Sequence, residues 1–324
     1  MNLNTTAAPH IHGKNSISAT MRQVLIALVP TLLVGIYVFG LRALLVVLVS
    51  MVASVAAEAL LRILTHKPQT VMDGSAAVTG LLLALTLPAN VPYWVAAVGG
   101  VFAVVVVKGV GGGLGENIFN PALGARAFLL LLWPASVTRF AAPGAELPLF
   151  GSAVDAVTAG TPLHTMQMPA LPEASLAEMF LGTIGGCIGE VSALALIAGG
   201  IYLVVRKVIS PRIPLAYLGS VAVLTLVFSK GEDPVAWMLY SLLGGGVMLG
   251  AIFMATDYAT SPVNAKGQIV YGVGCGVLTV LFRYYGLFPE GVTYSILIMN
   301  AVTWLLDKAF VPQRFGTGKG GAQK

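Results

Sequence analysis

Two long apolar stretches near the amino terminus decide what kind of protein this is. The chain reads QVLIALVPTLLVGIYVFG from residue 23 to residue 40 and RALLVVLVSMVASVAAEALLR from residue 42 to residue 62. A helix needs about 20 apolar residues to cross the roughly 30 Å hydrocarbon core of a bilayer, and each stretch has about that length. We therefore predict two membrane-spanning helices in this part of the chain.

The whole chain has the same character. Of its 324 residues, 57% are hydrophobic and 10% are charged. A soluble domain has roughly 45–50% apolar and about 25% charged residues. This composition excludes a soluble enzyme, a nucleic-acid-binding module and a disordered chain, and it indicates an all-α integral membrane protein.

Further apolar runs predict about ten membrane-spanning helices. The predicted spans are residues 23–40, 42–62, 74–88, 92–110, 120–134, 176–205, 213–229, 236–254, 268–286 and 291–310. The third and fifth are shorter than the roughly 20 residues of a full crossing. The sixth is longer, and we expect a kink or break near Gly185, Gly186 and Gly189.

The distribution of Lys and Arg predicts the orientation in the membrane. With the amino terminus inside, thirteen of these residues, including Lys108, flank the inner ends of the spans. Four, including Arg42 and Arg283, flank the outer ends, while Arg126 lies within the fifth span. Basic residues gather on the cytoplasmic side of membrane proteins, so both termini are predicted to be cytoplasmic. The net charge of +5 thereby follows from topology, and no nucleic-acid partner is expected. The polar residues 1–20 lack the apolar core of a cleavable signal peptide, so the first helix is expected to be retained.

Residue spacing indicates an internal duplication. A shift of 170 or 171 residues aligns Arg42 with Arg212, Gly74 with Gly244, Gly80 with Gly250, Thr86 with Thr256, and Gly115 with Gly286. Because each copy has five spans, the second copy must be inverted in the membrane, and inverted repeats place functional sites at broken helices near their interface. The predicted organisation is a cytoplasmic segment (1–22), a first five-helix repeat (23–134), a periplasmic loop (135–175), a second repeat (176–310) and a cytoplasmic tail (311–324).

The loop between the repeats contains Asp155-Ala156-Val157-Thr158-Ala159-Gly160-Thr161. Small and polar residues of this kind are ordinary in a connecting loop. A hydroxyl in an exposed loop, such as that of Thr161, can also accept a covalent group.

This stretch resembles the flavinylation motif of the RnfD family of Rnf-type complexes and of the related NqrB family of sodium-pumping NADH:quinone oxidoreductases. In these families an Asp, two spacer residues and the tetrapeptide Ser/Thr-Gly-Ala-Thr direct attachment of FMN through its phosphate to the last Thr. Asp155 and Thr161 match the acidic residue and the acceptor, and Thr158 matches the first residue of the tetrapeptide. The chain reads Thr-Ala-Gly-Thr, so Gly160 stands next to the acceptor and the central Ala and Gly are exchanged.

Other segments carry the same resemblance, in order, from residue 9 to about residue 300. They are Pro9-His10-Ile11-His12, Asp73-Gly74-Ser75-Ala76-Ala77-Val78-Thr79-Gly80, Gly112-Gly113-Leu114-Gly115-Glu116-Asn117-Ile118-Phe119-Asn120-Pro121, Ala255-Thr256-Asp257, Ser261-Pro262-Val263 and Pro289-Glu290-Gly291.

The resemblance implies an electron-transfer subunit of an ion-translocating ferredoxin:NAD oxidoreductase complex in the bacterial inner membrane. Covalent FMN at Thr161 would make the chain a flavoprotein and, through its phosphoester, a phosphoprotein. A second, non-covalent riboflavin is implied nearer the cytoplasm, with Asp73, Asn120, Arg126 and Lys266 as candidate lining residues. Implied partners are the FMN-bearing RnfG component and the membrane subunits of the complex, together with the lipid bilayer. No stand-alone catalytic site is expected.

Several of these residues have simpler interpretations. Asp73 precedes a helix that it can cap, and Arg126 can extend toward the cytoplasm. Lys266 can pair with Asp257.

Other residues give weaker signals. Glu58 and Glu190 lie within apolar stretches and are the carboxylates best placed for an ion path. The glycines of residues 111–115 suit either close helix packing or close approach of a flat ring. Neither the two cysteines nor the four histidines form a metal-binding pattern.

A channel or solute transporter without a redox cofactor is the competing interpretation, because an inverted repeat suits it equally well. A third possibility is a chain that only scaffolds other subunits.

Overall fold

The computed structural model describes residues 16–110, 112–113, 115–150, 162–167, 171–172, 174–286 and 291–311. Over these residues the protein is built of helices, and an isolated antiparallel bridge joins Pro88 to Cys187. The all-α prediction is therefore confirmed for the described part of the chain.

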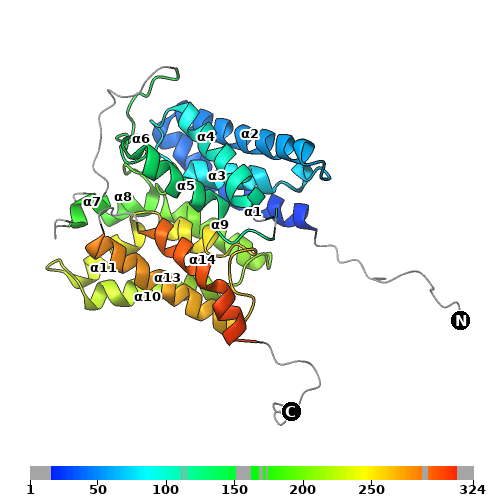
Figure 1. Cartoon of the computed structure of the whole chain (residues 1–324). Helices are drawn as coiled ribbons and strands as arrows, with labels where there is room; N and C mark the ends of the chain where they lie inside the picture. The colour runs from blue at the N-terminus through cyan, green and yellow to red at the C-terminus, as the bar shows by residue number, and fades with distance from the viewer. Residues whose placement is uncertain are drawn as a thin grey trace, which may run out of the picture.

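The first half of the chain contains five long or half-length helices. They are α1 (Ile17–Phe39), α2 (Leu41–Leu64), α3 (Ser75–Leu85), α4 (Tyr93–Phe102) with its π-helical continuation η2 (Ala103–Lys108), and α5 (Pro121–Leu132). Short elements flank them, namely the 3-10 turn η1 (Val71–Asp73) and α6 (Pro134–Val137). In Figure 1 this half forms one side of the molecule, and α2 packs along both α3 and α4.

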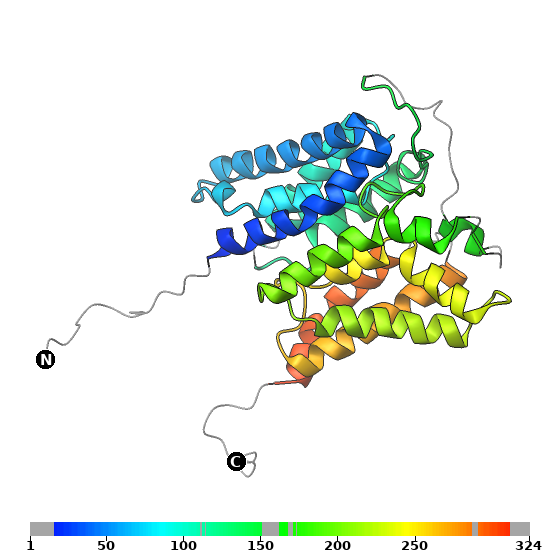
Figure 2. The same ribbon diagram turned by 180° about the vertical axis from the view of Figure 1, so that it is seen from behind.

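The second half begins with short elements and ends with long ones. Its helices are α7 (Pro162–Gln167), α8 (Leu176–Leu181), α9 (Ala193–Val205), α10 (Arg212–Val227), α11 (Pro234–Leu243), α12 (Val247–Leu249), the π-helix η3 (Gly250–Met254), α13 (Ala265–Tyr285) and α14 (Val292–Ala309). Figure 2 shows α1 of the first half lying beside α9 of the second. The start of α1 and the end of α14 lie at one end of the molecule, whereas α6, α7, α8 and the α10–α11 connection lie at the other.

Three helices, α1, α2 and α13, are long and apolar enough to cross a membrane by themselves among the described residues. A fourth crossing is possible if α11 and α12–η3, which are bent by 61° at their junction, form one span. The remaining apolar helices are shorter. The chain is thus an all-helical protein with several apolar helices, as expected of a multi-pass membrane protein.

Two predicted spans are interrupted. The sixth span, residues 176–205, is broken between α8 and α9, as its glycines predicted. The eighth span, residues 236–254, is also broken, because α11 ends before Gly244 and α12 begins at Val247. Gly245 and Gly246 have φ values of +66° and +67°, a left-handed conformation that an α-helix cannot contain.

The two halves meet where the loop after α3 crosses the loop before α9. The backbone N–H of Ile188 donates to the carbonyl of Leu87 at 3.0 Å, and that of Gly189 donates to the carbonyl of Leu85 at 2.8 Å. A Cβ on Gly189 would lie 2.7 Å from Leu85 Cβ, so only glycine allows this approach. Gly199 has the same role between α9 and α1, because a Cβ there would lie 2.2 Å from the carbonyl oxygen of Ala27.

We predict that Gly189→Ala lowers the apparent melting temperature of the detergent-solubilised protein. Overpacking of a close contact costs about 1–3 kcal/mol. Gly219→Ala on α10 is the matched control, because nothing lies within 4 Å of the added Cβ. Fluorescence-detected size exclusion after heating measures both, and equal melting temperatures for the two variants would contradict this account of the crossing.

Candidate functional site: two cavities joined by a buried lysine

A cavity that is partly open to the outside lies between the two halves of the chain. We call it cavity A. It lies among α1, α3, the start of α5, the end of α9 and η3, near the end of the molecule where α1 begins. Its polar lining includes Thr79, Lys108, Asn117, Asn120, Thr256 and Asp257. Apolar side chains such as Leu82 and Phe253 form much of the remaining wall.

Asn120 joins three elements at the wall of cavity A. Its side-chain oxygen caps α5 by accepting hydrogen bonds from the N–H groups of Ala122 and Leu123 at 3.1 and 3.3 Å. Its side-chain nitrogen donates to the carbonyl of Met254, the last residue of η3, at 3.2 Å. Its backbone N–H donates to Oδ1 of Asn300 on α14 at 3.1 Å. The buried Asn120 therefore links α5 to the second half of the chain.

Asp257 lines cavity A after η3 and is half-buried. Burial raises the pKa of its carboxyl group above the ordinary value, while hydrogen bonds from the backbone of Ala259 and the hydroxyl of Thr260 oppose the rise. The predicted pairing of Asp257 with Lys266 is wrong, because Lys266 is exposed and has no ion pair with a described residue.

The ion pair that the described residues do contain is buried. Lys108 Nζ, at the end of η2, lies 2.6 Å from Glu58 Oε1 on α2, and the two side chains are 4% and 2% exposed. The same Glu58 oxygen accepts a hydrogen bond from the hydroxyl of Thr70 at 3.0 Å. Glu58 Oε2 is buried and has no hydrogen-bond partner among the described residues. Removal of either partner of such a buried ion pair leaves an uncompensated charge in the protein interior, which strongly destabilises the fold.

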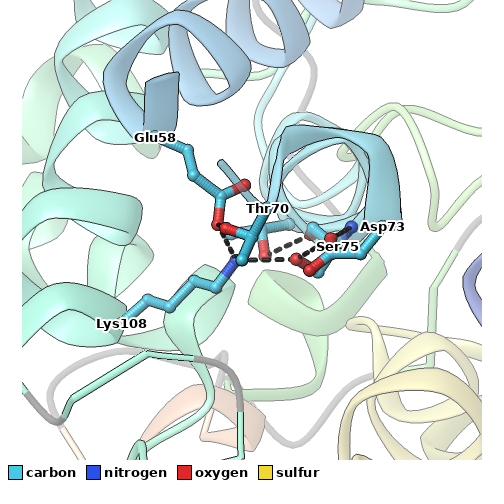
Figure 3. Close-up of polar contacts among 6 residues, drawn as sticks. Glu58, Thr70, Asp73, Ser75 and Lys108 are labelled. Carbon is cyan, nitrogen blue, oxygen red and sulfur yellow. Dashed lines mark hydrogen bonds and ion pairs between the residues drawn. The ribbon is translucent and has the colours of Figure 1, made fainter. Parts of the chain in front are cut away.

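Lys108 also continues the polar network toward α3, as Figure 3 shows. Its Nζ donates to Ser75 Oγ at 2.6 Å. The Ser75 hydroxyl and backbone N–H both donate to Asp73 Oδ1, at 2.5 and 2.7 Å. The N-cap residue of α3 is Gly74, and Asp73, one residue earlier, binds the first N–H of the helix and contacts the wall of cavity A through Ser75.

A second cavity, of about 380 Å³, lies on the other side of this network. We call it cavity B. It is lined by Glu58, Arg62, Thr65, Lys67, Lys108 and Gly113 among others. Lys108 is the residue that lines both cavities.

Arg126 does not line cavity A. It lines a third, central cavity of about 270 Å³, together with Thr86, Glu190 and the glycines that break α11 from α12. Both terminal nitrogens of the buried Arg126 lie 3.6 Å from Cys187 Sγ, at the crossing of the two loops. Arg126 therefore sits at the centre of the molecule rather than at its end.

The four candidate pocket residues are thus separated in space: Asn120 lines cavity A, Asp73 contacts its wall, Arg126 lies in the central cavity and Lys266 is exposed. The predicted flavin-attachment residues Asp155, Thr158, Gly160 and Thr161 lie outside the described residues. Lys108 was predicted only as a charge flanking a span. The sequence signal for the pairing of Lys108 with Glu58 was that each is an isolated charge near the end of an apolar run.

Comparison with known proteins identifies the family of the chain. The family model described as the NQR2, RnfD, RnfE family matches residues 4–316. The chain belongs to this family. The predicted resemblance is therefore confirmed over almost the whole sequence.

Three relatives of this RnfD-family chain are similar along nearly their full length, and each is the subunit designated D of its complex. That of the Na⁺-translocating ferredoxin:NAD⁺ oxidoreductase complex of Acetobacterium woodii is 48% identical over 98% of this chain and 97% of the relative. That of the proton-translocating ferredoxin:NAD⁺ oxidoreductase complex of Clostridium ljungdahlii is 41% identical over 96% of each. That of the ion-translocating oxidoreductase complex of Stutzerimonas stutzeri is 35% identical over 94% of this chain and 93% of the relative.

We predict that Lys108 and Glu58 are energetically coupled. Lys108→Met leaves a buried carboxylate without its counter-charge, and Glu58→Gln leaves a buried ammonium, so each single change is expected to cost about 3–5 kcal/mol. The double variant should be more stable than the sum of the two losses implies, which a double-mutant cycle of thermal unfolding in detergent measures.

Lys67→Met is the control for this cycle, because Lys67 lines cavity B but is exposed. It should unfold like the parent. Strict additivity of Lys108→Met and Glu58→Gln would show that the two side chains do not act as a pair.

Proposed function

We propose that this chain is the RnfD component of an Rnf-type ion-translocating ferredoxin:NAD oxidoreductase complex, where it passes electrons across the membrane. The observation that carries the proposal is the family match over residues 4–316, together with relatives named for the same component that align over nearly their full length. The chain then acts as one subunit of an oxidoreductase. Its partners are the other Rnf subunits, including the FMN-bearing RnfG component and the membrane subunits. The coupling ion is Na⁺ or H⁺, and relatives are named for each.

The proposed topology is ten crossings of the bacterial inner membrane by two inverted five-helix repeats, with both termini cytoplasmic. Support comes from the order of the elements, because a shift of 170 residues aligns α1 to α5 with α9, α10, α12–η3, α13 and α14. Matched elements also pack across the two halves, α1 on α9 and α5 on α14. The shorter helices are compatible with this topology because their ends lie inside the protein, where backbone groups have partners without lipid contact.

The proposed covalent cofactor is FMN esterified to Thr161, with Asp155, Thr158 and Gly160 forming the recognition sequence for its attachment. The spacing of these residues supports this proposal. The described segments on both sides, which end at residue 150 and resume at α7, lie at the end of the molecule opposite the start of α1. An acceptor between them would hold the flavin on the periplasmic side in the proposed topology.

The proposed second cofactor is a non-covalent riboflavin in cavity A, which would exchange electrons with the next carrier. The cavity combines apolar walls with a few polar groups, which is the usual character of a cofactor pocket. Asn117, Asn120 and Thr256 offer hydrogen-bonding groups for ring heteroatoms, and Val78 and Leu82 offer apolar surface for its flat faces.

We predict that the protein co-expressed with a flavin transferase gives a fluorescent band after denaturing electrophoresis. Thr161→Ala should remove the fluorescence, whereas Thr158→Ala should retain it because the acceptor hydroxyl remains. Mass spectrometry of the peptide 155–168 locates the added FMN. A colourless parent chain would contradict the attachment and favour the channel or transporter interpretation.

A separate prediction concerns cavity A. Val78→Phe fills the cavity from α3, so the flavin released by acid precipitation should fall to near zero while the covalent flavin stays with the pellet. Val223→Phe on α10 is the matched control, because Val223 is exposed on an outer surface. Equal amounts of released flavin from these two variants would place the second flavin outside cavity A.

A further inference from the structure

The ammonium group of Lys108 can interact electrostatically with groups in both cavities. Its ammonium group has three hydrogens, and the described contacts use two of them, on Glu58 and on Ser75. The group contacts a buried carboxylate that lines cavity B, and Lys108 itself lines both cavity A and cavity B. Its position is set by the last turn of a π-helix, a rare element that is frequent at functional sites.

Lys108 is the counter-charge of Glu58 among the described residues. Glu58 is 2% exposed, its Oε1 is shared by Lys108 and Thr70, and its Oε2 has no partner among the described residues. A buried carboxylate that loses its counter-charge is strongly disfavoured unless another cation neutralises it. Any force that draws the ammonium away from Glu58 must therefore favour uptake of a cation at Glu58 from cavity B.

A flavin in cavity A supplies such a force. Reduction by two electrons with uptake of one proton adds one net negative charge to the ring, and the electrons come from the ferredoxin side of the proposed complex. In a site of low dielectric constant, that charge attracts the ammonium group in its wall.

We propose that Lys108 couples the redox state of the occupant of cavity A to cation binding at Glu58. When the flavin is oxidised, Lys108 neutralises Glu58. When the flavin carries negative charge, the ammonium group of Lys108, which lines cavity A beside Ser75, compensates that charge. Glu58 then binds one cation, H⁺ or Na⁺, from cavity B. This inference rests on the proposed riboflavin site and assigns Lys108 as its electrostatic positioning residue.

Thermodynamic linkage makes the proposal measurable without turnover. If reduction favours cation binding at Glu58, then cation binding must favour reduction by the same factor. The midpoint potential of the flavin should therefore rise with cation concentration, and the rise should depend on Glu58.

The experiment uses the full chain in detergent with Thr161→Ala, so that only the non-covalent flavin absorbs. Its midpoint potential is measured by spectroelectrochemical titration with dithionite, against Na⁺ at constant ionic strength and against pH. Glu58→Gln should abolish the Na⁺ dependence or, if the cation is a proton, reduce the slope with pH. Lys108→Met should shift the potential to more negative values, because the cation in the cavity wall is lost.

Two further variants complete the test. Lys108→Arg keeps the charge and should keep a potential near that of the parent. Lys308→Met, at an exposed position on α14 that lines neither cavity A nor cavity B, should behave as the parent does. An unchanged potential in a flavin-bearing Lys108→Met variant would overturn the proposal. If that variant does not fold, a Glu58→Gln protein that retains the full cation dependence overturns it instead. A parent protein without releasable flavin would overturn the riboflavin site itself, and this inference with it.

Discussion

A break in a membrane helix leaves backbone carbonyl and amide groups that cannot form hydrogen bonds with lipid, so this chain has to provide their hydrogen-bond partners itself. The buried Arg283 of α13 donates to the carbonyls of Ser241 and Gly244 at 2.5 and 2.7 Å, where α11 ends. The buried Arg42 of α2 donates to the carbonyl of Ala89, which follows α3, and to that of Pro148, which follows α6. The two loops at the centre of the molecule pair with each other. These bonds allow short helices to end inside the protein.

Internal helix ends also create the polar environment in which a cofactor or an ion can be held. Cavity A forms where α3 and α5 begin and where η3 ends, and Asn120 connects these ends to one another. Asn300 extends the connection, because its side-chain nitrogen donates to the Tyr271 hydroxyl at 2.7 Å and to the Thr260 carbonyl at 3.1 Å. The proposed riboflavin site thus lies at the interface between the two halves, where one network of hydrogen bonds joins both.

The buried charges have two different roles. Arg42 and Arg283 were predicted as charges at the outer ends of spans, and their side chains instead turn inward to bind backbone carbonyls. Lys108 also turns inward, but its partner is the buried carboxylate of Glu58. A guanidinium remains charged in any protein environment and suits a structural bond, whereas an ammonium and carboxylate pair can respond to a new charge nearby.

The sequence by itself indicated a membrane environment, the approximate position of most helices, the break in the sixth span and the family. These features could be predicted because apolar run length and ordered motifs are local properties of the chain. It also indicated that a helix begins shortly after Asp73. Tertiary structure decided that α11 ends before Gly244, that Arg126 and Asn120 line different cavities, and that Lys108 meets Glu58 across 50 residues of chain. Those outcomes depend on which helix faces pack together, and the spacing of residues along one helix does not specify its neighbours.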